Sequence, residues 1–325
     1  MKGDWIAALL FCGMLLLAGC SAKAAPVEQQ TKPQSMAAFT RESRIEDVQN
    51  DPAFDGFGRL LFPTNTYYYS GDTLEELEFT YYSHIDPDEI VEIVNTLYDR
   101  VEAGQTVFYG IYTEQEKKSD PAKRDTGLFY FKGNPCEKFA ICNAGGAFAF
   151  VGAMQDSFPH ALELSKKGYN AFALIYRPGA QTACEDLARA ITFIFDHAQE
   201  LEVDTACYSL WGGSAGARMA AWLGTYGPAA FGGDDLPRPG TVVMQYTGLG
   251  EYSEEDPPTY ACVGDRDGIA PWQIMKARLD AMRADGIPTE FHRYPGLGHG
   301  FGLGTGTSAE GWLDDAVDFW EQQMK

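Results

Sequence analysis

One serine flanked by glycines has the residue types and spacing of an activated nucleophile. Ser214 lies in Gly212-Gly213-Ser214-Ala215-Gly216, a G-x-S-x-G pattern. An apolar run that suits a buried strand, 206–211, precedes the pattern, and a helix-favouring run, 215–223, follows it. A strand that turns at once into a helix crowds its own backbone, so the residues two positions either side must be very small. The pattern also occurs in ordinary loops, but this context favours a nucleophilic role for Ser214.

A nucleophilic serine needs a base, and two histidines follow Ser214 in the chain. His292 lies inside a strand-like run, 291–294, and we interpret it as structural or exposed. His299 lies in a glycine-rich loop, 295–302, after that strand and before the last helical run. We therefore predict that His299 takes the proton of the serine hydroxyl.

The acid that orients such a histidine is expected after the strand-like run 260–263. Two carboxylates follow it, Asp265 and Asp267. We predict Asp267, the acid three positions after the strand-end Gly264, as the orienting group. Asp265 is the alternative; otherwise it caps the turn or pairs with its neighbour Arg266.

Backbone N–H groups are needed to stabilise the negative charge that develops on the substrate oxygen. Ala215 places one at the start of the helix, where negative charge is favoured. A second glycine-rich turn, Asn143-Ala144-Gly145-Gly146, follows the apolar run 139–142. Glycine lets the backbone aim its N–H groups, so we predict that the amide of Gly145 or Gly146 acts with that of Ala215. The alternative for this turn is a plain strand-to-helix connection.

The composition limits the classes of partner that we expect the chain to bind. Its 325 residues are 45% hydrophobic and carry a net charge of −21, from 46 acidic and 25 basic residues. Such a charge argues against binding to nucleic acid or to anionic lipid. Without a C-x-x-C pair or a histidine cluster, we predict no metal site and no cofactor. Cys142, Cys207 and Cys262 lie in apolar runs where buried thiols act as small hydrophobic groups, and we expect no disulfide framework.

The N-terminus has the features of an export signal. An apolar run, 5–17, is too short for a comfortable membrane span and ends in Leu17-Ala18-Gly19-Cys20, which resembles the lipobox of bacterial lipoproteins. We predict a signal peptide over 1–19, a lipid on Cys20 and a flexible polar tether over 20–35. The protein would then be exported and anchored to the cell envelope by that lipid alone. An ordinary secretory signal ending near Ala25 is the alternative.

The rest of the chain divides at about residue 105. Within 36–105, apolar residues at helical spacing follow Asp86-Pro87, which predicts a capped amphipathic helix in an accessory segment packed on the main body. From 106 to 325, strand-like runs alternate with helical runs, with a charged turn over 114–125. This alternation predicts an α/β fold with a mostly parallel sheet covered by helices on both faces.

In this order, the turn at 143–146, the serine motif, Asp267 and His299 make the chain resemble an α/β-hydrolase over about 106–325. Within that superfamily it resembles the bacterial carboxylesterases, which include acetylesterases and polysaccharide deacylases. The resemblance implies a cofactor-independent serine esterase that hydrolyses short acyl esters, with acetylated carbohydrate as one substrate class. Two alternatives stay open: a serine peptidase of the prolyl-oligopeptidase type, and a surface binding protein with a degenerate site.

Overall fold

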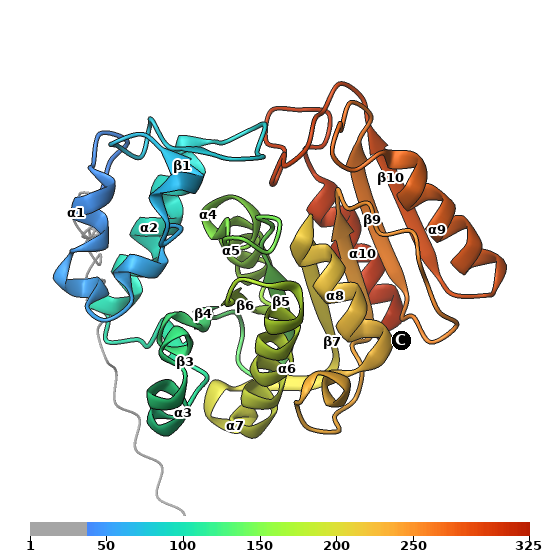
Figure 1. Ribbon diagram of the computed structural model, residues 1–325, viewed down its shortest axis with the longest axis horizontal. Helices are drawn as coiled ribbons and strands as arrows, with labels where there is room; N and C mark the ends of the chain where they lie inside the picture. The colour runs from blue at the N-terminus through green and yellow to red at the C-terminus, as the bar shows by residue number, and fades with distance from the viewer. Residues whose placement is uncertain (1–37) are drawn as a thin grey trace, which may run out of the picture. The chain divides into compact units, whose positions relative to one another are not determined.

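The computed structural model describes residues 38–325, so the predicted signal peptide, Cys20 and the whole of the predicted tether lie outside the described residues. Its centre is an eight-stranded sheet with the order β10-β9-β8-β7-β5-β6-β4-β3 (Figure 1). The strands are β3 (Phe108–Gly110), β4 (Gly127–Phe131), β5 (Glu137–Asn143), β6 (Asn170–Ile175), β7 (Val203–Gly213), β8 (Thr241–Gln245), β9 (Thr259–Gly264) and β10 (Thr289–Tyr294).

Most neighbouring strands in this sheet are parallel. The pairs from β10 through β9, β8, β7 and β5 to β6 are all parallel, whereas β4 runs antiparallel to both β6 and β3. Parallel strands end at the same edge of a sheet, so the loops that follow β5, β7, β8, β9 and β10 gather there. The predicted α/β architecture with a mostly parallel sheet is confirmed.

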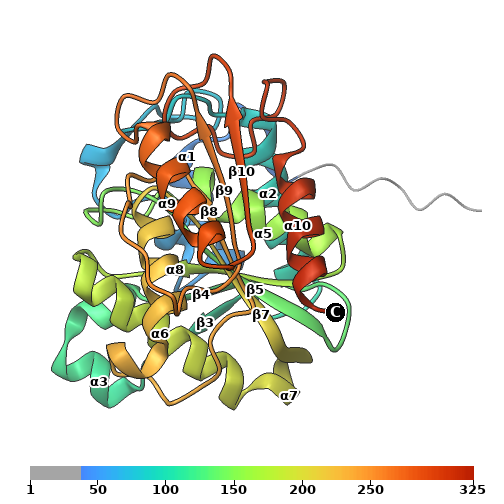
Figure 2. The same ribbon diagram turned by 90° about the vertical axis from the view of Figure 1, so that its right-hand side faces the viewer.

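Helices cover both faces of the sheet because most residues of its inner strands are apolar and buried. Helices α6, α8 and α9 lie on one face, and α5 and α10 on the other (Figure 2). The helices of this region are α4 (Ala153–Asp156), α5 (Phe158–Lys166), α6 (Ala180–Asp196), α7 (Ala198–Leu201), α8 (Ala215–Tyr226), the short 3-10 helix η5 (Pro228–Phe231), α9 (Trp272–Ala284) and α10 (Trp312–Gln323).

Residues 38–105 belong to the same compact unit as the sheet. Their largest element is α2, Pro87–Glu102, whose apolar face packs against α4 and α5. The Asp86 side chain accepts a hydrogen bond from the N–H of Asp88, and Pro87 occupies the first helical turn, which confirms the predicted capped helix. The smaller elements are α1 (Ile45–Gln49), η1 (Pro52–Phe54), η2 (Gly58–Leu60), η3 (Thr66–Tyr68), β1 (Tyr69–Ser70) and β2 (Glu78–Phe79).

Two local predictions were wrong. The charged stretch 114–125 is not a turn but a helix, α3 (Glu114–Ser119), followed by the 3-10 helix η4 (Pro121–Asp125). Thr113 and Glu116 form a reciprocal capping box that starts α3, and this short-range pair outweighs the lack of an apolar face. Cys207 is exposed rather than buried, because β7 is distorted there and Cys207 has a φ of +53°.

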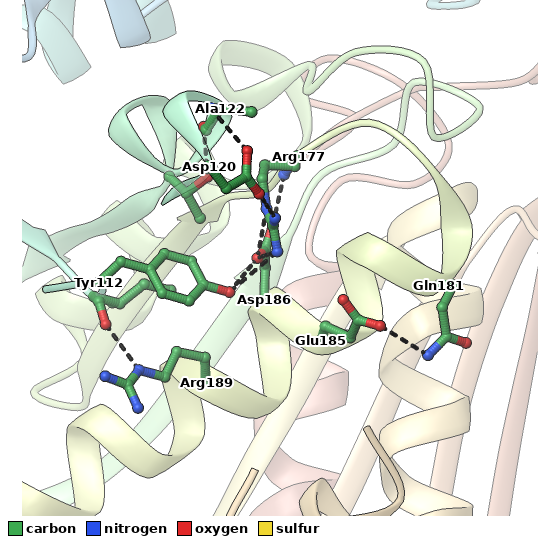
Figure 3. A network of polar contacts seen from close by, with 10 residues as sticks. Tyr112, Asp120, Ala122, Arg177, Gln181, Glu185, Asp186 and Arg189 are labelled. Atoms are coloured by element: carbon green, nitrogen blue, oxygen red, sulfur yellow. Dashed lines mark hydrogen bonds and ion pairs between the residues drawn. The ribbon is translucent and has the colours of Figure 1, made fainter. Parts of the chain in front are cut away.

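A buried polar network ties the end of β6 to α6 and η4 (Figure 3). The guanidinium of Arg177 donates to both carboxylate oxygens of Asp186, which is fully buried, and to Asp120 at 2.5 Å. The hydroxyl of Tyr112 donates to the same Asp186 at 2.5 Å. The arginine is thus fully paired, as a buried charge must be.

Candidate active site

Ser214 occupies a strained turn between β7 and α8. Its φ of +53° and ψ of −114° lie outside the regions favoured by residues with side chains. A Cβ on Gly216 would lie 1.9 Å from the carbonyl oxygen of Asn143, and one on Gly212 would lie 2.3 Å from the backbone of Gly216. Only glycine fits at either position, which is the steric requirement that the sequence motif implied.

His299 is the base nearest to Ser214. It lies in the loop after β10, and its Nε2 is 3.0 Å from the serine Oγ. The imidazole is 8% exposed and packs against the ring of Tyr246 with a centroid separation of 5.0 Å. A base in this position can accept the hydroxyl proton as the oxygen attacks.

Asp267 lies at the other ring nitrogen of the imidazole, Nδ1. Its Oδ2 is 2.8 Å from His299 Nδ1, and its Oδ1 accepts hydrogen bonds from the N–H groups of Ile269 and Ala270 at 2.8 and 2.7 Å. These backbone donors fix the carboxylate in the loop after β9. The structure brings Ser214, His299 and Asp267 together in the order of a catalytic triad.

The two alternative residues lie elsewhere. Asp265 accepts a hydrogen bond from the N–H of Gly296 at 2.7 Å and so ties two loops together. His292 lies on β10, with its Nε2 2.6 Å from a carboxylate oxygen of Glu290. Neither side chain is hydrogen-bonded to Ser214 or His299.

The predicted backbone donors need one correction. As the first residue of α8, Ala215 has an N–H with no acceptor inside the helix, and it lies beside Ser214. The N–H of Gly145, however, donates to Asp156 Oδ2 at 2.7 Å and is therefore not free to bind an oxyanion. In the described part of the chain the N–H of Gly146 has no such acceptor, so Gly146 is the candidate that remains of the two.

The loop that carries these amides is itself strained. Gly146, Ala147 and Phe148 have φ values of +124°, +54° and +56°. Each non-glycine residue in this region costs on the order of 1–3 kcal/mol, and such strain gathers at functional sites. The sequence pointed to the glycines but not to the two strained residues after them.

A buried carboxylate that the sequence analysis missed lies beneath this loop. Asp156 on α4 accepts hydrogen bonds from the hydroxyls of Tyr82 and Tyr246 as well as from Gly145. Burial raises the pKa of Asp156, although these three donors oppose the shift. No sequence signal marks Asp156, because its partners lie 74 and 90 residues away in the chain.

A cavity of about 240 Å³ opens beside the serine hydroxyl. It lies between α8, the strained loop after β5 and the loops after β8 and β9. No sequence pattern marks Phe148, Arg218 or Thr247 as part of it. The residues that line it are Ala147, Phe148, Ser214, Ala215, Arg218, Tyr246, Thr247, Gly248, Ile269, Ala270 and His299.

Within residues 38–325, no cluster of histidine, cysteine, aspartate or glutamate side chains has the arrangement of a metal site. The five cysteines of this region are free thiols. Over the same residues, no helix combines the length and apolar character needed to cross a bilayer.

Solved structures of other proteins share this arrangement of sheet and helices. The acetyl ester-xyloside bifunctional hydrolase of Caldicellulosiruptor lactoaceticus aligns with a TM-score of 0.55 at 22% identity, over 66% of this chain and 95% of that one. MGS-M1, an α/β hydrolase enzyme from a Medee basin deep-sea metagenome library, aligns with a TM-score of 0.52 at 22% identity, over 61% and 93%. The chain has the α/β-hydrolase fold.

A third structure with this hydrolase fold is the thermophilic esterase Est2 of the planctomycete Thermogutta terrifontis, solved with propionate bound. It aligns with a TM-score of 0.53 at 18% identity, over 66% of this chain and 93% of that one. Residues 133–235, which include Ser214 and the glycine-rich turn after β5, match the BD-FAE family. No curated protein matches the chain in sequence.

Proposed function

We propose that this protein is a serine esterase that hydrolyses short-chain acyl esters through an acyl-enzyme intermediate. One observation carries the proposal: His299 lies within hydrogen-bonding distance of both Ser214 Oγ, at 3.0 Å, and Asp267 Oδ2, at 2.8 Å. The strained serine, the cavity beside it and the similarity in fold to known esterases support the same function.

In the first half of the reaction, Ser214 Oγ forms a bond to the ester carbonyl carbon while His299 Nε2 takes the hydroxyl proton. The carbonyl oxygen becomes an oxyanion, which the N–H groups of Ala215 and Gly146 stabilise. Asp267 holds the ring and stabilises the imidazolium. The oxyanion then collapses, the bond to the alcohol breaks, and His299 returns its proton to the departing alkoxide.

In the second half, water replaces the alcohol. His299 removes a proton from the water as its oxygen bonds to the acyl carbon, and the second oxyanion uses the same backbone donors. Collapse breaks the acyl–serine bond, releases the carboxylic acid and returns the proton to Ser214. No cofactor takes part in either half.

The cavity favours a short acyl group. Its volume of about 240 Å³ lies below the range of roughly 300–1,000 Å³ that is typical for larger ligands. Est2 was solved with propionate, and the Caldicellulosiruptor enzyme is an acetyl ester hydrolase that also acts on xylosides. We therefore propose small acyl groups, with acetyl groups on carbohydrate as one natural source.

Kinetics with 4-nitrophenyl acetate tests the proposal. Replacing Ser214 with alanine should lower kcat by about 10⁶-fold, as expected when the nucleophile of a working triad is lost. Ser119→Ala, at an exposed position on α3, is the control and should keep the wild-type rate. Equal rates for wild type and Ser214→Ala would refute the esterase mechanism.

The same preparation distinguishes the two other functions. Cleavage of a proline-containing peptide substrate without preference for esters would favour a peptidase. If neither esters nor peptides are hydrolysed, a binding protein with a degenerate site is the better description. A set of aryl esters with acyl chains of increasing length then measures the preference for small acyl groups.

We also propose that the protein is exported and held at the cell envelope by a lipid on Cys20. The lipobox-like sequence before Cys20 motivates this proposal. Metabolic labelling with a fatty acid should label the wild-type chain and not the Cys20→Ser variant. Label on that variant would contradict lipidation at this residue.

A further inference from the structure

Arg218 lies one helical turn after the serine, on the same face of α8. The backbone N–H of Arg218 donates to the backbone carbonyl of Ser214 at 3.3 Å, and residues four apart in a helix share a face. Arg218 lines the cavity beside the serine, and a Cβ on Gly248, which lines the same cavity, would lie 3.5 Å from a nitrogen of its guanidinium. A fixed positive charge therefore faces the space that a substrate would fill.

Among residues 38–325, Arg218 has no counter-ion. The buried Arg278 is paired with Asp256, and Arg177 is paired with Asp186 and Asp120 (Figure 3). For Arg218, by contrast, no carboxylate oxygen of residues 38–325 lies within 4.0 Å. A half-buried guanidinium loses hydration without gaining a partner, and the positive end of α8 beside it makes its position less favourable still.

The rest of the cavity wall also favours an anion. None of the lining residues is acidic, although the chain has 46 acidic residues and a net charge of −21. Thr247 lines the same cavity, is 1% exposed, and has a hydroxyl with no hydrogen-bond partner. Buried polar groups are rarely left unpaired, so this hydroxyl is a second polar group at the cavity that has no partner among residues 38–325.

We propose that Arg218 binds a carboxylate of the substrate, so that the preferred substrates are esters that also carry a carboxylate group. The inference rests on the proposed esterase function and specifies its substrate class. A guanidinium matches a carboxylate with two parallel hydrogen bonds. A single cation with no lysine beside it suits a monoanion better than a doubly charged phosphate.

The position of Arg218 sets where the carboxylate lies relative to the ester. Four residues of helix separate it from Ser214, which is a rise of about 6 Å. A carboxylate several bonds from the ester reaches the guanidinium from either side of the scissile bond. It then belongs to the acyl group, as in a half-ester of a dicarboxylic acid, or to the alcohol, as in an acetylated sugar acid.

Two pairs of substrates distinguish these sides. The acyl-side pair is 4-nitrophenyl hydrogen adipate and its neutral counterpart 4-nitrophenyl hexanoate. The alcohol-side pair is 4-acetoxybenzoate and its methyl ester. The measured quantity is the ratio of kcat/KM for the anionic ester to that for the neutral one. We expect a wild-type ratio above one in one pair, which assigns the carboxylate to that side, and a decrease of the ratio with added salt.

Arg218→Gln should lower that ratio by about 10–100-fold, because hydrogen bonds to charged groups contribute roughly 1.5–3 kcal/mol. Arg218→Lys should restore part of it. Arg124→Gln removes the same charge from an exposed arginine on η4, so its ratio should equal that of the wild type. A wild-type ratio below one in both pairs, or a ratio that Arg218→Gln leaves unchanged, would overturn the proposal.

Binding gives a readout that does not depend on turnover. Calorimetry on Ser214→Ala should show, in one of the two pairs, the anionic ester binding more tightly than its neutral counterpart, and the added Arg218→Gln change should remove this difference. Equal affinities in both pairs would overturn the carboxylate site. Failure of the neutral esters to react with wild type would instead count against the esterase function, while the binding comparison still decides on the carboxylate.

Discussion

Asp156 connects three parts of the chain beneath Ser214. It accepts hydrogen bonds from Gly145 in the loop after β5, from Tyr82 before α2 and from Tyr246 after β8. A Cβ on Gly213 would lie 2.2 Å from its carboxylate, so the serine turn also rests on it. We therefore infer that Asp156 is a positioning residue for the proposed oxyanion donors.

Replacing Asp156 with asparagine should lower kcat by about 10–100-fold with a smaller effect on KM. The asparagine amide has one acceptor oxygen where the carboxylate has two, so at least one of the three donors loses its acceptor. The loop with Gly146 then shifts. Small misplacements of catalytic groups lower kcat by about this factor. Steady-state kinetics with 4-nitrophenyl acetate measures kcat and KM of the variant. Tyr82→Phe removes one donor alone and should have a smaller effect; an unchanged kcat in Asp156→Asn would refute the positioning role.

A buried histidine makes stability depend on pH. Burial lowers the pKa of His160 on α5 from 6.5 to about 4. Between these values the unfolded chain binds a proton that the native state does not, so the free energy of unfolding falls as the pH falls. At 1.4 kcal/mol per unit, the native state should lose about 3 kcal/mol between pH 7 and pH 4 through this residue.

Urea unfolding at pH 7 and pH 4.5 tests this dependence. His160→Leu cannot titrate, so its loss of stability between the two pH values should be about 2–3 kcal/mol smaller than that of the wild type. His197→Leu, at a partly exposed position, is the control and should keep the wild-type difference. The same loss in wild type and His160→Leu would contradict the assignment.

At the scale of elements, a buried ion pair fixes α9 against its neighbours. Arg278 on α9 is 3% exposed; it donates to the carbonyl of Glu251 at 3.0 Å and pairs with Asp256, which is 6% exposed. Asp256 also accepts a hydrogen bond from Thr225 on α8. The pair thus joins two helices on the same face of the sheet.

Arg278→Met should lower the free energy of unfolding by about 3–5 kcal/mol, because it leaves the carboxylate of Asp256 buried without a counter-ion. The double variant Arg278→Met/Asp256→Leu should be more stable than Arg278→Met alone, since no charge stays buried. Denaturant unfolding measures both. If the double variant is the less stable of the two, the cost lies in packing and not in the charge.

At the scale of the whole molecule, residues 38–105 pack in the same compact unit as the sheet and do not form a separate domain. The N–H of Ser83 donates to the carbonyl of Gly300 in the histidine loop at 3.2 Å, and Thr305 in the same loop donates to Glu89 on α2 at 2.5 Å. The accessory segment therefore contacts the loop that carries the base. The segment and the sheet should unfold together.

Leu97→Ala in α2 tests this cooperativity. Leu97 is fully buried, so its truncation should cost about 2–5 kcal/mol. The tryptophans of the described chain all lie after residue 105, so their fluorescence reports on the sheet and its helices. The fluorescence transition should move to lower denaturant in Leu97→Ala and stay in place in Asp99→Ala, an exposed control. No movement in Leu97→Ala would show that the segment unfolds separately.

Local patterns in the sequence predicted much of the fold. The capped start of α2 at Asp86-Pro87 and the alternation of strands and helices both agree with the structure. These features depend on residues at most a few positions apart, where periodicity and capping operate. The Thr113 capping box that starts α3 was present in the sequence and overlooked.

The sequence by itself determined which residue types follow the ends of which strands. This was enough to select Ser214, Asp267 and His299 as candidates. Only the tertiary structure decided that Gly145 gives its N–H to Asp156 and that Arg218 has no counter-ion within residues 38–325. Those facts depend on distances between side chains far apart in the chain. A hydrogen bond or an ion pair exists only when the fold has set both partners within about 3–4 Å, and no local pattern encodes that separation.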